Sequence, residues 1–108
     1  MSLDKLYTLL GEIPGYSGKV AYYAFPAGAA PALPYIVYLE TSTDNFMAGN
    51  QVYLKRTAVD IELYTEIKDP AAEAALEAVL NAAELPWEKS EDYLESESCW
   101  MHTYSITI

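Results

Sequence analysis

The sequence predicts an α+β domain: a small antiparallel β-sheet with a long central hairpin and two helices packed on one face. Three observations support this fold class. Residues 57–65 alternate apolar and polar side chains with the period of a half-buried strand. Residues 69–83 repeat apolar side chains at the spacing of an amphipathic helix. Strand patterns both precede and follow this helix, as in an α+β sandwich.

Composition limits both the domain organisation and the function. A chain of 108 residues with 52% hydrophobic content predicts one domain, residues 1–108. The net charge of −10 argues against a groove that neutralises phosphates and against contact with anionic membranes. The single cysteine, Cys99, is interpreted as a structural thiol and is compatible with a reducing cytoplasm. The start of the chain lacks the apolar core of a signal peptide, because Asp4 and Lys5 occupy it.

The first quarter of the chain predicts a helix and a strand. Residues 2–10 place leucines on one helical face, with Ser2 as the N-cap and Gly11 as a left-handed C-terminal residue. Residues 19–25 follow a turn and predict a strand. The proline-rich and alanine-rich segment 26–34 predicts a loop in extended backbone. It is interpreted either as an ordinary crossing between strands or as a flexible segment that reaches a neighbour.

The middle of the chain predicts the hairpin. Residues 35–41 are almost continuously apolar and predict a central strand covered on both faces. Residues 43–50 predict a loop, because turn-forming Asp, Asn and Gly residues flank Phe46 and Met47. Two large apolar residues are unusual at a polar loop tip. Either these two side chains contact a partner or they fold back onto their own core.

A long strand, residues 51–66, returns from this loop. Val59, Ile61 and Leu63 share one face, whereas Asp60 and Glu62 face the other. The alternation before Lys55 has the opposite phase, which predicts a bulge or bend at residues 55–57. A strand of this length exceeds what a small domain covers, so part of the hairpin is expected to project and to meet another chain.

The last third of the chain predicts a helix and one or two strands. Asp69 is a helix N-cap and Pro70 occupies the first helical position. Glu73 and Glu77 are assigned to the solvent side of this helix. Residues 103–108 alternate as a half-buried strand. The acidic segment 88–98 is interpreted as an edge strand followed by a turn.

No motif for catalysis or metal binding stands out in the sequence, so neither an enzyme nor a cofactor is expected. His102 is the only histidine, and no His-x-x-x-His, Cys-x-x-Cys or Glu-x-x-His spacing is present. The glycines are scattered among turns and form no phosphate-binding loop. His102 lies in phase with Trp100 and Tyr104, which predicts a partly buried histidine beside aromatic residues.

The order of these segments resembles the small tail-completion or tail-terminator proteins of long-tailed phages and prophages. The most specific part is the block at residues 34–65: an apolar strand, an Asp-Asn-Phe loop and a long strand that ends in Glu-Leu-Tyr-Thr. The resemblance extends over essentially the whole chain, including the Lys-Asp-Pro helix start and the C-terminal strand of alternating Tyr and Ile.

The resemblance implies a structural virion protein without catalysis or cofactor. It implies a homohexameric ring that caps the tail-tube protein, ends tail polymerisation and joins the tail to the head connector. The location would be the virion tail or neck, after synthesis in the bacterial host cytoplasm. Sequence-specific nucleic acid binding and membrane contact are not expected. The residues themselves indicate four interface candidates: Phe46, Met47, Lys55 and Arg56.

Three alternatives remain open from the sequence. The first is another head-tail connector or minor tail component. The second, from a different class, is an acidic inhibitor that mimics DNA, although the carboxylates lack a regular phosphate-like spacing. The third is a small enzyme that uses His102 and Cys99.

Overall fold

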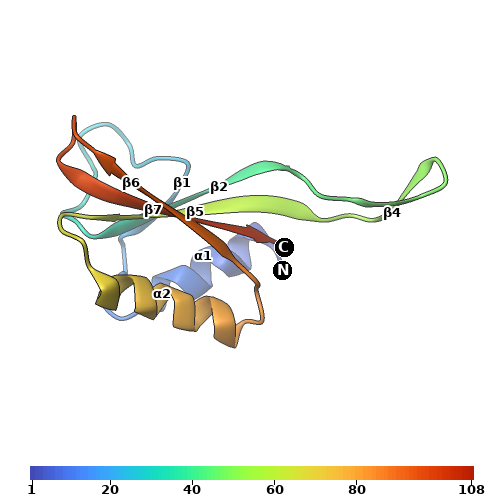
Figure 1. The fold of residues 1–108 in the computed structure, drawn as a ribbon, viewed down its shortest axis with the longest axis horizontal. Coiled ribbons are helices and arrows are strands. Elements are labelled where there is room, and N and C mark those ends of the chain that lie inside the picture. Colours follow the sequence, from blue (N-terminus) through green and yellow to red (C-terminus); the bar gives the residue numbers. More distant parts are fainter.

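The computed structural model describes the backbone of residues 1–108 and every side chain except those of Phe46 and Tyr53. The elements run in the order α1 (Leu3–Gly11), β1 (Val20–Tyr22), β2 (Tyr35–Thr43), β3 (Phe46–Ala48), β4 (Gln51–Leu54), β5 (Thr57–Thr65), α2 (Pro70–Ala82), β6 (Glu88–Leu94) and β7 (Cys99–Thr107). They form a five-stranded sheet of order β1-β2-β5-β7-β6 and a separate two-stranded ribbon of β3 and β4 (Figure 1). The predicted α+β fold class is confirmed.

Most of the sheet is antiparallel, with β5 at its centre. Strand β5 pairs with β2 on one side and with β7 on the other, and β6 pairs with β7, all in antiparallel register. Strand β1 differs, because it runs parallel to β2, with Val20 opposite Ile36. The prediction of an antiparallel sheet is therefore wrong for this strand, because an alternating pattern identifies the buried face of a strand but not its partner's orientation.

The hydrophobic core lies between the helices and one face of the sheet. Val59, Ile61 and Leu63 on β5 are all fully buried, which confirms the alternation of this strand. Both helices supply leucines to the same cluster, and both lie on the same side of the strands (Figure 1). The predicted packing of two helices on one face is therefore confirmed.

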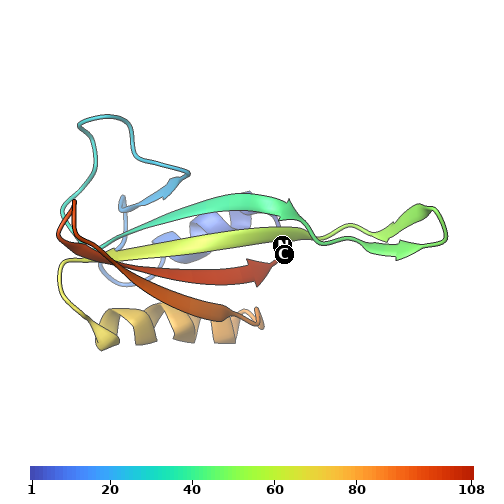
Figure 2. The ribbon, with the colours of Figure 1, turned by 45° about the horizontal axis from the view of Figure 1, so that its top comes forward.

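The opposite face of the sheet is covered in part by the segment 23–34. Its Phe25 ring packs edge-on against Tyr35, with ring centroids 5.1 Å apart, and Tyr35 in turn contacts Tyr64. In Figure 2 this segment arches over the side of the sheet away from α2. The segment is thus a crossing between β1 and β2 that is partly held by its own sheet.

Local capping follows the sequence at the start of both helices. The Ser2 hydroxyl accepts a hydrogen bond from the Lys5 amide, and Asp69 accepts one from the Ala72 amide. The predicted left-handed end at Gly11 is wrong. Gly11 is the last helical residue, and Glu12 caps the helix with φ of −80°. The left-handed conformation occurs four residues later, at Gly15 in the following turn.

Beyond the sheet, β2 and β5 continue into the ribbon of β3 and β4. We call residues 44–56, which contain this ribbon, the arm. The arm extends along the longest axis of the molecule, whose extents are 48 × 28 × 23 Å (Figure 2). The predicted bend is confirmed, because the long strand breaks into β4 and β5 at Lys55 and Arg56. The predicted loop 43–50 is partly wrong, since residues 46–48 form β3.

Cys99 is buried at the start of β7, and we expect it to react slowly with thiol reagents. Burial raises the pKa of the Cys99 thiol, and the nearby Glu97 carboxylate raises it further, so little thiolate is present near neutral pH. At pH 8, a disulfide reagent such as DTNB is expected to modify the native protein at least about a hundredfold more slowly than the urea-unfolded protein. Equal rates in the two states would contradict a structural role for this thiol.

Candidate functional site

The arm presents an apolar surface to solvent. Met47, Val52 and Leu54 expose 61%, 51% and 52% of their surface. Met47 lies directly opposite Val52 in the β3–β4 register, and Leu54 lies two residues beyond Val52 on the same strand. Directly opposed residues share a face of a ribbon, as Met47 and Val52 do, whereas a β-bulge separates this pair from the pair of Leu54 with residue 46. We call these three exposed apolar side chains of the β3–β4 ribbon the arm's apolar row.

The base of the arm is held by polar contacts. The Asp44 amide donates to the Arg56 carbonyl at 2.9 Å, and the Arg56 amide donates to the Asn45 side chain at 3.0 Å. These bonds secure the point at which the ribbon leaves the sheet. Lys55 and Arg56 both sit there with exposed side chains, so the two adjacent cations mark the junction between the arm and the body.

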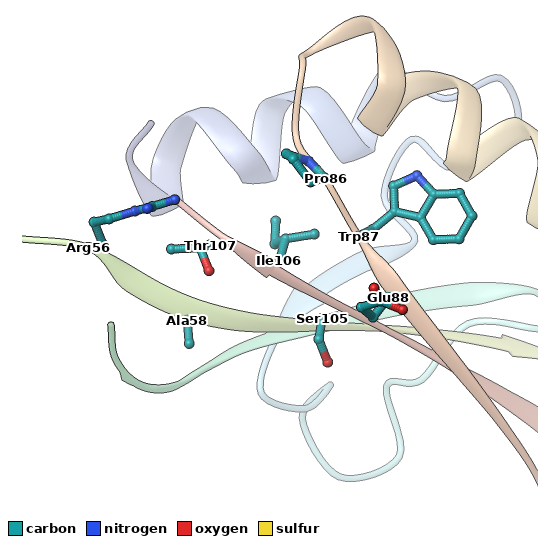
Figure 3. A pocket seen from close by; sticks show the side chains of 8 residues that line it. All are labelled: Arg56, Ala58, Pro86, Trp87, Glu88, Ser105, Ile106 and Thr107. Atoms are coloured by element: carbon teal, nitrogen blue, oxygen red, sulfur yellow. The ribbon is translucent and has the colours of Figure 1, made fainter. Parts of the chain in front are cut away.

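A shallow hollow of about 340 Å³ adjoins this junction. Apolar side chains and the Arg56 side chain line this hollow together. The lining residues are Arg56, Ala58, Pro86, Trp87, Glu88, Ser105, Ile106 and Thr107 (Figure 3). They come from the base of the arm, from β5, from β7 and from the start of β6 with the two residues before it. The hollow was not predicted from the sequence, because these segments are distant along the chain.

The interface candidates predicted from the sequence all belong to the arm. Met47 lies on its apolar row, and Lys55 and Arg56 lie at its base. The backbone of Phe46 lies in β3, but its side chain is outside the described residues. Of the two alternatives for the loop tip, folding back onto the core is wrong for Met47, because this side chain is largely exposed.

A second feature is a cluster of charged residues between α2 and the β6–β7 edge, in which Glu73 and His102 are buried and the others are partly exposed. Its members are Lys68, Glu73, Glu77, Lys89, Glu91 and His102. The assignment of Glu73 to the solvent side of the helix is wrong, since only 3% of this residue is exposed. Strand β6 passes over that face of α2 and brings Lys89 within 3.0 Å of both Glu73 and Glu77. The helix pattern alone could not reveal this covering strand.

His102 belongs to the same cluster. The prediction of a partly buried histidine is wrong, because His102 is fully buried. The charged groups around it were not predicted. Nδ1 lies 3.2 Å from Glu91 Oε1 and 3.5 Å from Glu73 Oε1, while Nε2 lies 3.4 Å from the Thr65 hydroxyl. Residue 91 is the cross-strand partner of residue 102, a pairing that no local sequence pattern specifies.

The charges of the cluster determine the protonation of its members. Burial alone raises the pKa of the Glu73 carboxyl, but the ammonium groups of Lys68 and Lys89 outweigh burial and lower it. Tyr104 donates a 2.6 Å hydrogen bond to Glu77, and its pKa is raised by burial first and by this bond second. Glu73 and Glu77 are therefore carboxylates at neutral pH, held by ammonium and hydroxyl donors.

His102 and Cys99 do not form a catalytic pair. They are separated by three positions on β7, so their side chains leave opposite faces of the strand. His102 faces α2 and its carboxylates, whereas Cys99 lies on the other side. The geometry thus gives no support to the alternative of an enzyme built on these two residues.

Comparisons with known proteins add no family assignment. No family model, curated protein or solved structure matches the chain. Within the part of the chain that the structure describes, neither helix combines the length and the apolar character needed to cross a membrane.

Proposed function

We propose that this protein assembles with copies of itself into a ring through its arm, as a structural virion protein that caps a phage tail tube, ends tail polymerisation and joins the tail to the head. The observation that supports this proposal most directly is the projecting arm with its apolar row, Met47, Val52 and Leu54. The role within the virion follows from the resemblance of the sequence to tail-terminator proteins.

An isolated two-stranded ribbon is at best marginally stable in water, and exposed apolar rows mark sites of association. Burial of apolar surface contributes about 25 cal/mol per Å². A neighbour that covers the apolar row therefore stabilises both the ribbon and the assembly. This explains why the chain places three large apolar side chains on its most solvent-exposed segment.

The hollow beside Arg56 is the docking site that we assign to the neighbour's arm. Its Pro86 and Trp87 offer apolar surface to the row, above the buried Ile106. An arm that docks on the body of the next copy forms a heterologous contact, in which the two copies use different surfaces. Repeated heterologous contacts close into a ring when the rotation between copies allows it.

Charge favours the same arrangement. Lys55 and Arg56 are adjacent cations on a chain with 16 acidic and six basic residues, and Glu88 lines the hollow that we assign as the docking site. An acidic ring also repels the phosphates of DNA, which suits a channel that DNA passes through without binding.

We therefore expect the assembled ring to show no tight binding to duplex DNA at physiological salt, measured by fluorescence anisotropy. Tight binding would contradict this role.

The test of the proposal is the mass in solution. We expect light scattering after gel filtration to show a species that grows with concentration towards a hexamer. Replacing Met47 and Leu54 together with Asp places two charges in the row, and desolvating them costs several kcal/mol each, by order of magnitude. The double variant is therefore expected to remain monomeric, with circular dichroism and melting temperature close to those of the unchanged protein.

Ile67→Asp is the matched control, because Ile67 is equally exposed but lies outside the arm, between β5 and α2. It should assemble like the unchanged protein. Loss of assembly in the control would show that added charge, rather than the arm, is responsible. A chain that stays monomeric at high concentration, and does so on purified tail tubes as well, would overturn the proposal.

A further inference from the structure

We propose that Glu73, Glu91 and His102 form a binding site for a divalent transition-metal ion, with Zn²⁺ as the best fit to the donor atoms. One oxygen of each carboxylate and one nitrogen of the imidazole lie within 4.8 Å of one another, and Nδ1 is the nitrogen that faces both carboxylates. The inference is independent of the proposed assembly, because the site lies between α2 and the β6–β7 edge and uses no residue of the arm.

The hydrogen bond at the far side of the imidazole assigns the tautomer of His102. The Thr65 hydroxyl donates its only hydrogen to the Ile67 carbonyl at 2.7 Å, so it has none to donate to His102. Towards His102 Nε2, 3.4 Å away, the Thr65 oxygen can only accept. Nε2 therefore carries the hydrogen, and in neutral imidazole Nδ1 presents its lone pair to the carboxylates.

This lone pair lacks a partner in a place where a partner is expected. Among the described side chains, three buried polar atoms form no hydrogen bond, and two of them are His102 Nδ1 and Glu73 Oε2. Lys68 Nζ lies 2.8 Å from that Oε2, although not in hydrogen-bonding geometry. A nitrogen lone pair that faces carboxylate oxygens is repulsive, and a cation placed between them makes every contact attractive.

The distances suit a small tetrahedral ion. Ligands bound about 2.0–2.1 Å from a tetrahedral Zn²⁺ lie about 3.3–3.4 Å from one another. In the structure, Nδ1 is 3.2 Å from Glu91 Oε1 and 3.5 Å from Glu73 Oε1. Imidazole nitrogen and carboxylate oxygen are both ligands that Zn²⁺ accepts, and a water would complete the four-coordinate set.

The surrounding contacts orient these ligands, as they do in known metal sites. Thr65 fixes the imidazole through Nε2, and Lys89 holds the Glu73 carboxylate through a 3.0 Å bond from Nζ. Three separate elements, α2, β6 and β7, each contribute one ligand. The ion would thus act as a structural clamp between the second helix and the sheet edge.

Lys68 competes for the same position. Its ammonium pairs with both Glu73 and Glu91, and its side chain is 46% exposed, so it can turn out to solvent. With Lys68 withdrawn, the carboxylates of Glu73, Glu77 and Glu91 are opposed only by Lys89 within the cluster. A divalent ion then restores neutrality around an uncharged His102. The apo form keeps the lysine, and the loaded form exchanges it for the metal.

The test uses the full chain, freed of metal by chelation, and Zn²⁺ in isothermal titration calorimetry at pH 7. We expect one Zn²⁺ per chain. Lys68→Gln removes the competitor and is expected to tighten binding by about five- to tenfold, the equivalent of an exposed ion pair or two. Lys5→Gln makes the same change in net charge on the remote helix α1 and should leave the affinity unchanged.

Glu91→Gln removes one ligand from a partly exposed edge position, so this variant is expected to fold. It should lose Zn²⁺ binding by at least about tenfold, whereas Glu88→Gln on the same strand should not. A ¹⁵N spectrum of the His102 ring provides a direct readout, because metal at Nδ1 and a proton at Nδ1 give different shifts.

Three results would overturn the proposal. The first is no binding of Zn²⁺ at micromolar concentration in Lys68→Gln. The second is equal loss in Glu88→Gln and Glu91→Gln, which indicates an adventitious ion only. The third is a His102 ring that stays doubly protonated in the presence of Zn²⁺, which shows that a proton bridges the imidazole and the carboxylates instead.

Discussion

Replacing Ile61 with Ala is expected to lower the free energy of unfolding by about 3–4 kcal/mol, because it removes buried methyl groups and leaves a cavity in a close-packed core. Ile61 is fully buried at the centre of β5, with Tyr38 and Tyr104 as its cross-strand neighbours. Both rings are themselves held, by the edge-on contact of Tyr22 with Tyr38 and by the bond from Tyr104 to Glu77. The site therefore has little freedom to collapse around the smaller side chain.

Urea denaturation monitored by tryptophan fluorescence measures this change. Ile67→Ala is the control, since it is the same chemical change at a residue that is 67% exposed, and it should alter stability by less than about 0.5 kcal/mol. A domain of this size is stable by roughly 5–15 kcal/mol, so the core variant loses a large share of the total. A cost below about 1 kcal/mol at Ile61 would contradict the packing of the central strand.

The parts of the fold that the sequence predicted correctly are those determined by local chemistry. Val59, Ile61 and Leu63 alternate because one face of β5 is dry, and the structure buries all three. Asp69 starts α2 because its side chain satisfies the Ala72 amide. The bend at Lys55 and Arg56 was predicted correctly because the alternation of apolar and polar residues changes phase there.

The parts that it predicted incorrectly depend on partners that are distant along the chain. The parallel direction of β1 is fixed by pairing with β2 across the segment 23–34. Residues 46–48 were predicted to be a loop. They form a strand because residues 51–54 provide backbone hydrogen-bond partners opposite them. The left-handed residue expected at Gly11 occurs instead in the following turn, at Gly15, where the chain heads for β1.

The two candidate sites differ in the same way. The projecting arm with Met47 and the adjacent cations was predicted from neighbouring residues in the chain, whereas Val52 and Leu54 were not among the predicted interface residues. The charged cluster was not, because Glu73, Glu91 and His102 come from three elements and follow no metal-binding spacing. Their proximity results from the pairing of β6 with β7 and from the packing of α2 against that edge.

Glu73→Ala is the second variant with a large expected effect. The helix pattern and the structure predict different losses of stability for it. On the pattern alone, Glu73 and Glu77 are equivalent solvent-facing residues whose removal costs little. In the structure, Glu73 accepts a bond from Lys89, pairs with Lys68 and is almost fully buried. Its removal leaves two ammonium groups without their shared carboxylate, next to the buried His102 ring.

The loss expected for Glu73→Ala in the metal-free protein is about 2–3 kcal/mol, less than the 3–5 kcal/mol typical of a fully buried ion pair. The reduction follows because both lysine side chains are partly exposed and can turn towards water. Glu77→Ala breaks a bond from Tyr104 and one from Lys89 at a more exposed position, and should cost about 1–2 kcal/mol. Urea denaturation in the presence of EDTA measures both. Equal and small losses at the two positions would mean that β6 does not cover α2, and the metal site proposed there would lose its basis.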